Sequence, residues 1–304
     1  MWQSFVVLKT HSRKDGCMRK FSTAVFFLFM IFAAGVILQK RYNFISILET
    51  STVESQKKSE DYVGALRKGM MERQKSITVS FVGKSEEVKK YSVDAISKVF
   101  EIDGKETSSD YDYLRYHYAG TSITMTGFGR SFQVNYNVDY LENKKQMQEV
   151  DKKVKHLIRE MKLEKKSDYK KVKKIHDYII QNVQYDVSTK NNSAYAALFK
   201  KSSACQGYAT LVYKMMTEAG IPCRIIAGRS SGEAHAWNIV KVNKKWYNLD
   251  CTWDDPVGEP DPSTVHYEFF LKSDGDFKDH QRDKEYDSRE FRAQYPIALK
   301  SYGN

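Results

Sequence analysis

The sequence predicts an α+β protein preceded by an N-terminal membrane-spanning helix, because its 304 residues contain three kinds of segment. Charged stretches with apolar residues every three or four positions predict amphipathic helices. Stretches that alternate apolar and polar residues around short turns predict β-hairpins. One uncharged run of 18 residues has the length of a transmembrane helix. With 29% charged residues, the remainder has the composition of a soluble domain, which excludes a multi-span membrane protein.

The uncharged run covers residues 21–38 (FSTAVFFLFMIFAAGVIL) and would be about 27 Å long as a helix, close to the thickness of the hydrocarbon core. The basic residues before it outnumber those directly after it, which predicts that residues 1–20 form a cytoplasmic tail and that the rest lies outside the cell. We therefore expect a single-pass signal-anchor in the cell membrane. A cleaved signal peptide, which would give a secreted protein, is the alternative.

Residues 39–142 are expected to form a stalk and a small α+β region. His117 lies among tyrosines in a strand-like pattern, where a packing role is favoured over catalysis. The expected elements are a helix-compatible stalk at 42–73, a strand at 76–82, a helix at 85–100, and a hairpin of 111–126 with 131–141.

Residues 143–304 are expected to form the catalytic domain, which begins with amphipathic helices at 143–162 and 168–182. The formal net charge of +11 fits either a solvated basic face or an anionic partner such as a cell-wall polymer. Since no nucleic-acid-binding signature is present, nucleic acid is not expected as a partner. The four cysteines are too few for a disulfide scaffold and lack zinc-site spacing, so no metal or cofactor is expected, while a Cys223–Cys251 bridge stays open.

Cys205 lies where a helix is expected to begin. Ser203 and Gln206 fit the S-x-x-Q capping box, which would make Cys205 the second helical residue. The positive helix end favours the thiolate, and the free N–H groups there can donate to an oxyanion. A small buried cysteine that fills a gap is the alternative. Gln206 itself could donate to the oxyanion, although its capping role already accounts for it.

A predicted hairpin of residues 235–242 and 245–252 carries the partners of this thiol. Asn243-Lys244 suits a two-residue turn, which would pair Val242 with Lys245. His235 and Asp250 would then lie diagonally on one face, within side-chain reach. A carboxylate placed there can orient an imidazole and stabilise its protonated form, so Cys205, His235 and Asp250 could form a catalytic triad. Alternatively, His235 is a surface residue and Asp250 caps the next turn.

The stretch from about Asp168 to His280 resembles the transglutaminase-like superfamily. The matching motifs are KIHDYIIQNVQYD (174–186), SACQGYA (203–209), AGIPCRIIAG (219–228), HAWNIV (235–240), WYNLDCTWDDP (246–256) and YEFFLKSDGDFKDH (267–280), the last resembling the tail of bacterial members. The resemblance implies a papain-like core in which a Cys-bearing helix packs on an antiparallel sheet. It also implies Cys205 as nucleophile, His235 as base and Asp250 as orienting acid, with Tyr185 and Trp237 lining the site.

These features predict a membrane-anchored, cell-surface cysteine peptidase or acyltransferase. We expect it to hydrolyse peptide or amide bonds in protein or peptidoglycan peptides. Protein-glutamine gamma-glutamyltransferase cross-linking is one alternative, although Gln206 and Gly207 follow the cysteine where animal cross-linkers typically have Trp, and no calcium site is evident. A non-catalytic binding or wall-organising module on the same scaffold is the other.

Overall fold

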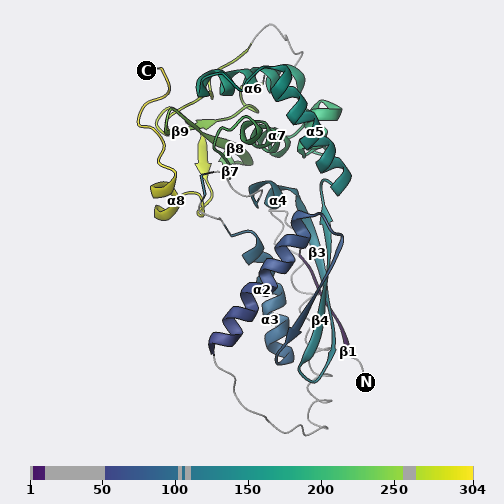
Figure 1. Cartoon of the computed structure of the whole chain (residues 1–304). Helices are drawn as coiled ribbons and strands as arrows, with labels where there is room; N and C mark the ends of the chain where they lie inside the picture. Colours follow the sequence, from purple (N-terminus) through teal and green to yellow (C-terminus); the bar gives the residue numbers. More distant parts are fainter. Residues whose placement is uncertain (1–2, 11–51, 102–104, 107–110, 256–264, 304) are drawn as a thin grey trace.

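The computed structural model describes residues 3–10, 52–101, 105–106, 111–255 and 265–303. Figure 1 shows two bodies joined around the short helix α4 (Tyr111–His117). One contains a long antiparallel sheet with helices α2 (Thr52–Met71) and α3 (Ser85–Val99) against it. The other contains a bundle of helices around a second sheet, and the C-terminal segment lies at its side (Figure 1). The predicted α+β fold class is confirmed.

The sheet of the first body has the strand order β1-β3-β4-β2, and every neighbouring pair is antiparallel. Its hydrophobic core lies between the sheet and the two helices, with Leu66, Val99 and Val134 fully buried. The structure confirms the predicted strand at 76–82 and the helix over most of 85–100. The strands are β1 (Gln3–Thr10), β2 (Ser76–Val82), β3 (Tyr118–Phe128) and β4 (Ser131–Tyr140).

The predicted strand at 111–126 was wrong in its first half, because residues 111–117 form α4. The segment YDYLRYH alternates aromatic and polar residues, but Tyr113, Leu114 and His117 also share one helical face and are buried there. His117 Nδ1 lies 2.8 Å from the carbonyl oxygen of Tyr113, one helical turn back, and the imidazole is fully buried. Tertiary packing on both bodies therefore decides the conformation of a segment whose local pattern is ambiguous.

The second body packs three helices, α5 (Lys144–Glu160), α6 (Asp168–Asn182) and α7 (Cys205–Glu218), around a shared apolar core. Helix α7 is buried on nearly all sides, and it lies on the face of the second sheet formed by strands β7 and β8. The sheet order is β10-β7-β8-β9, from β7 (Cys223–Ser230), β8 (Glu233–Val242), β9 (Lys245–Leu249) and β10 (His280–Arg282). The predicted helices at 143–162 and 168–182 are confirmed.

A second apolar cluster covers the other face of this sheet and includes Trp237, Trp246, Phe277 and Tyr295. The C-terminal segment with helix α8 (Arg289–Gln294) contributes to it. Three short elements, β5 (Gln184–Tyr185), the π-helix η1 (Ala196–Lys200) and β6 (Ser202–Ser203), precede α7, and β5 pairs in parallel with β6.

The predicted register of the β8–β9 hairpin is confirmed. Val242 pairs with Lys245, and Asn238 pairs with Leu249. Asn243 and Lys244 both have positive φ, at 50° and 68°, as the two central residues of a type I′ turn require. Asp250 therefore follows the end of β9 on the side of β8 from which His235 projects.

A buried ion pair joins the two bodies. Arg224 on β7 is 1% exposed, and its Nε and Nη2 donate to the two carboxylate oxygens of Asp112 on α4, both at 2.8 Å. Asp112 also accepts a hydrogen bond from the backbone N–H of Ile225 at 3.0 Å. Because both charges are out of water, loss of either partner would leave the other buried and uncompensated, so α4 and the second sheet depend on each other at this contact.

The predicted anchor at residues 21–38 and most of the predicted tail lie outside the described residues. Within the described part of the chain, no helix combines the length and the apolarity that a membrane crossing requires. Strand β1 pairs antiparallel with β3 along Gln3–Thr10. This pairing and a membrane crossing at 21–38 exclude each other, since the crossing would put β1 and β3 on opposite sides of the bilayer.

Candidate active site

Cys205 is the first residue of α7, one position earlier than predicted, because Ala204 is the N-cap. The predicted capping box was wrong. Ser203 belongs to β6 instead, and its hydroxyl donates to the carbonyl oxygen of Asn191 at 3.1 Å. The first helical hydrogen bonds run from Gly207 and Tyr208 to the carbonyl of Ala204. The backbone N–H groups of Cys205 and Gln206 thus precede the helical ladder and are available to an oxyanion.

The close packing around Gly207 leaves no room for a side chain two residues after the cysteine. A Cβ at this position would lie 1.8 Å from Ser203 Oγ and 2.8 Å from the carbonyl oxygen of Ser193. Any larger residue would push the first turn of α7 away from the strand and loop that precede it. The glycine therefore lets the helix begin close to β6, with the half-buried Cys205 at its mouth.

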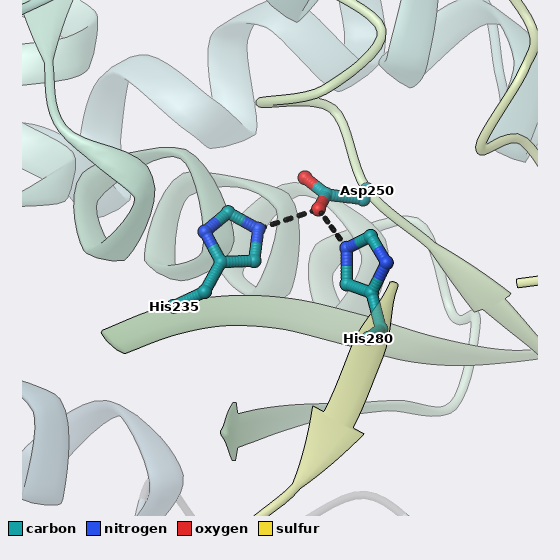
Figure 2. Close-up of side chains that lie close together, drawn as sticks. All are labelled: His235, Asp250 and His280. Atoms are coloured by element: carbon teal, nitrogen blue, oxygen red, sulfur yellow. Dashed lines mark hydrogen bonds and ion pairs between the residues drawn. The ribbon is translucent and has the colours of Figure 1, made fainter. Parts of the chain in front are cut away.

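His235 and Asp250 are in direct contact, as the hairpin register predicted. His235 Nε2 lies 2.6 Å from Asp250 Oδ2 (Figure 2), with side chains only 8% and 1% exposed. The other ring nitrogen, Nδ1, is not used by Asp250, and Cys205 is close enough to His235 to influence its pKa. The structure therefore places His235 and Asp250 in direct contact, with Cys205 near the imidazole.

Each carboxylate oxygen of Asp250 has a separate role. Oδ1 accepts the backbone N–H groups of Thr252 at 2.8 Å and Trp253 at 3.2 Å, which caps the turn after β9. Oδ2 binds His235. Turn capping and imidazole binding were alternatives in the sequence, but the structure shows both at once. The cap fixes the carboxylate plane and so directs Oδ2 at the imidazole.

The electrostatics of the pair favour a charged imidazole. Burial disfavours the imidazolium of His235. The charge and hydrogen bond of Asp250, together with the nearby Cys205, outweigh this effect and raise the pKa of His235 to about 10. Burial also favours the neutral acid of Asp250. The charge and hydrogen bond of His235, together with those of His280, nevertheless hold the pKa of Asp250 well below its usual range. At neutral pH the pair is therefore an imidazolium and a carboxylate.

Asn238, the last residue of the HAWN motif, ties the strand that bears His235 to the helix that bears Cys205. Its buried amide donates to the carbonyl oxygen of Ala209 on α7 at 3.0 Å and to that of Arg224 on β7 at 3.3 Å. This contact keeps β8 and α7 at a fixed distance, so it constrains the distance from sulfur to imidazole.

The three other predicted site residues differ in their placement. Tyr185 on β5 is half-buried and close enough to Cys205 for the two groups to interact electrostatically, and burial together with that neighbour raises its pKa. Trp237 is 1% exposed and stacks on His235, with ring centroids 6.1 Å apart, so it is a wall beneath the imidazole.

The amide of Gln206 donates to the carbonyl oxygens of Tyr116 and Asn192. That leaves Gln206 no side-chain N–H for an oxyanion.

Sequence reasoning missed two residues of the site. His280 on β10 places Nε2 2.9 Å from the same Asp250 Oδ2 that His235 contacts (Figure 2). Trp253 is 41% exposed, and its ring lies edge-on to His235 at 6.4 Å between centroids. His280 ends the tail motif at 267–280 and Trp253 lies inside WYNLDCTWDDP. Only the chain reversal that brings β10 beside β7 shows that the tail reaches Asp250.

His235, Asp250 and His280 also form a group of possible metal ligands within the described residues, with ligand atoms no more than 4.8 Å apart. Tetrahedral zinc with bonds of about 2.0–2.1 Å separates neighbouring ligand atoms by roughly 3.3 Å. The two Nε2–Oδ2 distances here are 2.6 and 2.9 Å, which are hydrogen-bond lengths. The arrangement therefore fits shared protons better than a shared cation.

Cys223 and Cys251 are both buried and have free thiols in the structure. Burial raises the pKa of each thiol well above its ordinary value. Both are therefore neutral and unreactive fillers of the core around α7. Of the cysteines in the described residues, Cys205 alone has the exposure of a nucleophile.

Comparison with known proteins gives one family for the region around this site. Residues 155–251 match the sequence model of the transglutaminase-like superfamily. The chain is 29% identical over 131 residues (37% of the chain) to the kyphoscoliosis peptidase of Mus musculus, and 28% identical over 115 residues (32%) to that of Homo sapiens. These matches cover 20% and 17% of the relatives, so the chain spans about a fifth of their length.

Among solved structures, the periplasmic domain of TgpA from Pseudomonas aeruginosa is similar over 51% of this chain and 79% of its own. The identity is 14% and the TM-score is 0.30, so this likeness supports no statement on function. The family match covers α6, α7 and the β7–β9 sheet, and it includes Cys205, His235 and Asp250. Residues 155–251 of this protein are therefore similar to the transglutaminase-like superfamily.

Proposed function

We propose that this protein is a thiol enzyme that catalyses acyl transfer through Cys205, His235 and Asp250. The observation that carries the proposal is the half-buried thiol at the start of α7 near His235, whose imidazole contacts a buried, ionised carboxylate. A thiolate beside an imidazolium at a helix N-terminus is the environment in which cysteine is most nucleophilic.

The reaction proceeds in two halves. In the resting ion pair, the proton of the Cys205 thiol resides on Nδ1 of His235, and the thiolate attacks the carbonyl carbon of an amide. The backbone N–H groups that precede the helical ladder stabilise the oxyanion. His235 then donates its proton to the leaving amine, the C–N bond breaks, and a thioester remains on Cys205. In the second half, His235 takes a proton from water, which attacks the thioester and releases the acid.

Peptides and amides are the proposed substrates, with hydrolysis as the main outcome. The relatives that match the chain are named peptidases, which favours hydrolysis over cross-linking. The exposed ring of Trp253 beside His235 offers an apolar surface for a substrate side chain. Tyr185, half-buried near Cys205, lies where it could contact the acyl group. Protein or peptidoglycan peptides are the proposed source of the amide.

The proposed location is the outer face of the cell membrane, with the anchor at 21–38 and residues 39–142 between anchor and catalytic domain. Its support is the uncharged length of that run and the basic residues before it. The net charge of +11 supports contact with an anionic wall polymer. In an anchored protein β1 would have to leave its position beside β3.

A thiol-labelling experiment tests the proposal. Iodoacetamide at neutral pH should alkylate Cys205 selectively, as mapped by mass spectrometry, and His235→Ala should slow that alkylation by at least about tenfold because the ion pair is lost. Cys223→Ala is the matched control, since it removes a buried thiol and leaves the rate at Cys205 unchanged. An alkylation rate at Cys205 that is the same in His235→Ala would contradict the proposal.

A second assay separates hydrolysis from transfer. A glutamine-containing peptide is incubated with the protein and a fluorescent primary amine. Release of ammonia or of a cleaved peptide without amine incorporation supports hydrolysis. Incorporation that disappears in Cys205→Ala supports cross-linking. If the thiol alkylates slowly and neither product forms with any of a panel of peptides, the non-catalytic binding module becomes the better explanation.

A further inference from the structure

His280 shares the carboxylate that orients His235. It is the first residue of β10, its side chain is 1% exposed, and Nε2 lies 2.9 Å from Asp250 Oδ2. Figure 2 shows the two imidazoles approaching that one oxygen from different strands. The other nitrogen of His280, Nδ1, lies 3.0 Å from the carbonyl oxygen of Lys278.

The partners of His280 require a proton on each ring nitrogen. A carbonyl oxygen only accepts hydrogen bonds, so Nδ1 must donate to Lys278. Asp250 is ionised, and its Oδ1 is already occupied by two backbone N–H groups, so Oδ2 accepts from Nε2 as well. An imidazole that donates from both nitrogens is the cation.

The surroundings of His280 suit a cation. Its ring lies 3.9 Å from that of Phe277 and 5.2 Å from that of Trp237, measured between centroids. Trp253 and Phe269 complete an aromatic enclosure at 5.8 and 5.4 Å. Aromatic faces attract a buried cation and exclude water from its hydrogen bonds.

The other charged groups around His280 are largely paired with one another. His235 faces it at 5.4 Å between ring centroids. His280 also borders a cavity of about 180 Å³ whose other charged lining residues are Asp274, Arg282, Asp287 and Arg292. Asp274 binds Arg282 at 3.1 Å and Arg292 at 2.8 Å, and Asp287 binds Arg292 at 2.6 Å. Asp250 is therefore the carboxylate that balances His280.

We propose that His280 is a positioning residue whose two ring nitrogens donate to Lys278 and Asp250, so that it shares Asp250 with His235 and limits how tightly His235 holds its proton. This inference rests on the proposed function. The resting site then holds two cations, on His235 and His280, and two anions, on Cys205 and Asp250. Without the second cation, Asp250 would bind the His235 proton so strongly that the imidazolium would be a poor acid toward the leaving amine.

Replacing His280 with glutamine removes the charge and keeps a donor for Asp250. The rings of His235 and His280 are 5.4 Å apart between centroids. At this distance a positive charge on one ring lowers the proton affinity of the other by roughly tenfold or more, even with the effective dielectric of a protein site. The proton affinity of His235 should rise in the variant. Turnover of an amide substrate, whose leaving amine needs the His235 proton, should fall about tenfold. Turnover of an activated ester with the same acyl group should stay within about twofold, because its leaving group needs no proton.

The thiolate gives a second readout. With one cation fewer, the pH at which alkylation of Cys205 reaches half its maximal rate should rise by about one unit. His117→Gln is the matched control, since His117 is also fully buried, places Nδ1 against a carbonyl and places Nε2 3.2 Å from the carboxylate of Glu142. It should leave the amide-to-ester ratio and the alkylation midpoint unchanged.

A loss of amide and ester turnover by the same factor in His280→Gln, with the alkylation midpoint unmoved, would reduce His280 to a structural residue and overturn the proposal. Nitrogen-15 NMR of the ring nitrogens provides a test that needs no turnover. Both nitrogens of His280 should carry protons in the folded protein, and a ring with a proton on only one nitrogen would also overturn the proposal. If instead the parent protein neither alkylates nor turns over while His280 is doubly protonated, the proposed function fails and the protonation of His280 stands.

Discussion

Replacing Asp250 with asparagine perturbs the site with almost no change of shape, so its effect measures the charge of the carboxylate. The backbone N–H groups of Thr252 and Trp253 hold Oδ1, which forces the amide oxygen of the asparagine into that position. Its NH₂ group then takes the place of Oδ2 and faces Nε2 of both His235 and His280. His235 must turn its lone pair towards the asparagine, so Nδ1 carries the proton and cannot receive one from Cys205.

The magnitude follows from the pKa of His235. Asp250 and Cys205 raise it from an ordinary 6.5 to about 10 against the effect of burial. That difference corresponds to about 5 kcal/mol between the two protonation states, as an order of magnitude. In Asp250→Asn the main stabilising charge is gone, so the pKa of His235 should fall to or below its ordinary value. At pH 7.5 an ordinary pKa would leave only about a tenth of His235 protonated. Together with the wrong tautomer of the neutral ring, this should lower kcat/KM for an amide by roughly 10²–10⁴-fold.

The assay measures kcat/KM as a function of pH, and the rate of Cys205 alkylation is measured over the same pH range as a second readout. In the parent, activity should persist into alkaline solution and decline only as pH approaches about 10, where His235 loses its proton. In Asp250→Asn this decline should move to near or below pH 7. Asp254→Asn is a control that removes a neighbouring buried carboxylate bound to His176. If the alkaline decline stays near pH 10 in Asp250→Asn, the role assigned to the carboxylate is refuted.

The same pair predicts how folding stability depends on pH. His235 binds its proton more tightly in the folded chain, so its contribution is complete below about pH 6.5 and is lost as pH rises towards about 10. Asp250 binds its proton less tightly when folded, so its contribution is present above about pH 4 and is lost in more acidic solution. The free energy of unfolding, measured by urea denaturation, should therefore fall at both ends of this window. In Asp250→Asn it should be lower and flatter between them.

Three further predictions concern the scaffold and its location. Gly207→Ala should destabilise the fold by about 1–3 kcal/mol, because its Cβ would lie 1.8 Å from Ser203 Oγ; an unchanged Tm would contradict the close approach. Asp112→Asn should cost about 3–5 kcal/mol in urea denaturation, since it leaves Arg224 buried without its carboxylate; a cost under 1 kcal/mol would show that the pair is dispensable. If residues 21–38 span the membrane, a tag before residue 3 should resist external protease on intact cells, and cleavage there would favour the pairing of β1 with β3 instead.

The main helices and the central hairpin could be predicted because their patterns are local. The helices at 143–162 and 168–182 follow from apolar residues at helical spacing, and the β8–β9 register follows from the two residues Asn243 and Lys244. The contact between His235 and Asp250 followed from that register, since the side-chain period of a strand fixes which residues share a face.

The features that sequence reasoning missed depend on contacts between distant segments. Ser203 looked like an N-cap, but pairing of β6 with β5 takes it into a strand, and Ala204 becomes the cap. Residues 111–117 looked extended, but packing against both bodies makes them helical. His280 showed no local pattern that links it to Asp250. Only the pairing of β10 with β7 brings His280 to Asp250. The hydrophobic periodicity of a sequence does not predict which distant strands pair.

Trapping the acyl group on the enzyme is the most direct test of a nucleophilic Cys205. The full chain is mixed with an activated acyl ester, quenched in acid within its first turnover, and analysed by intact and peptide mass spectrometry. A mass increase equal to the acyl group on the peptide that contains Cys205, slowed in His235→Ala and absent in Cys205→Ala, is the predicted result. Turnover that persists in Cys205→Ala, or an acyl group found on another residue, would contradict the mechanism.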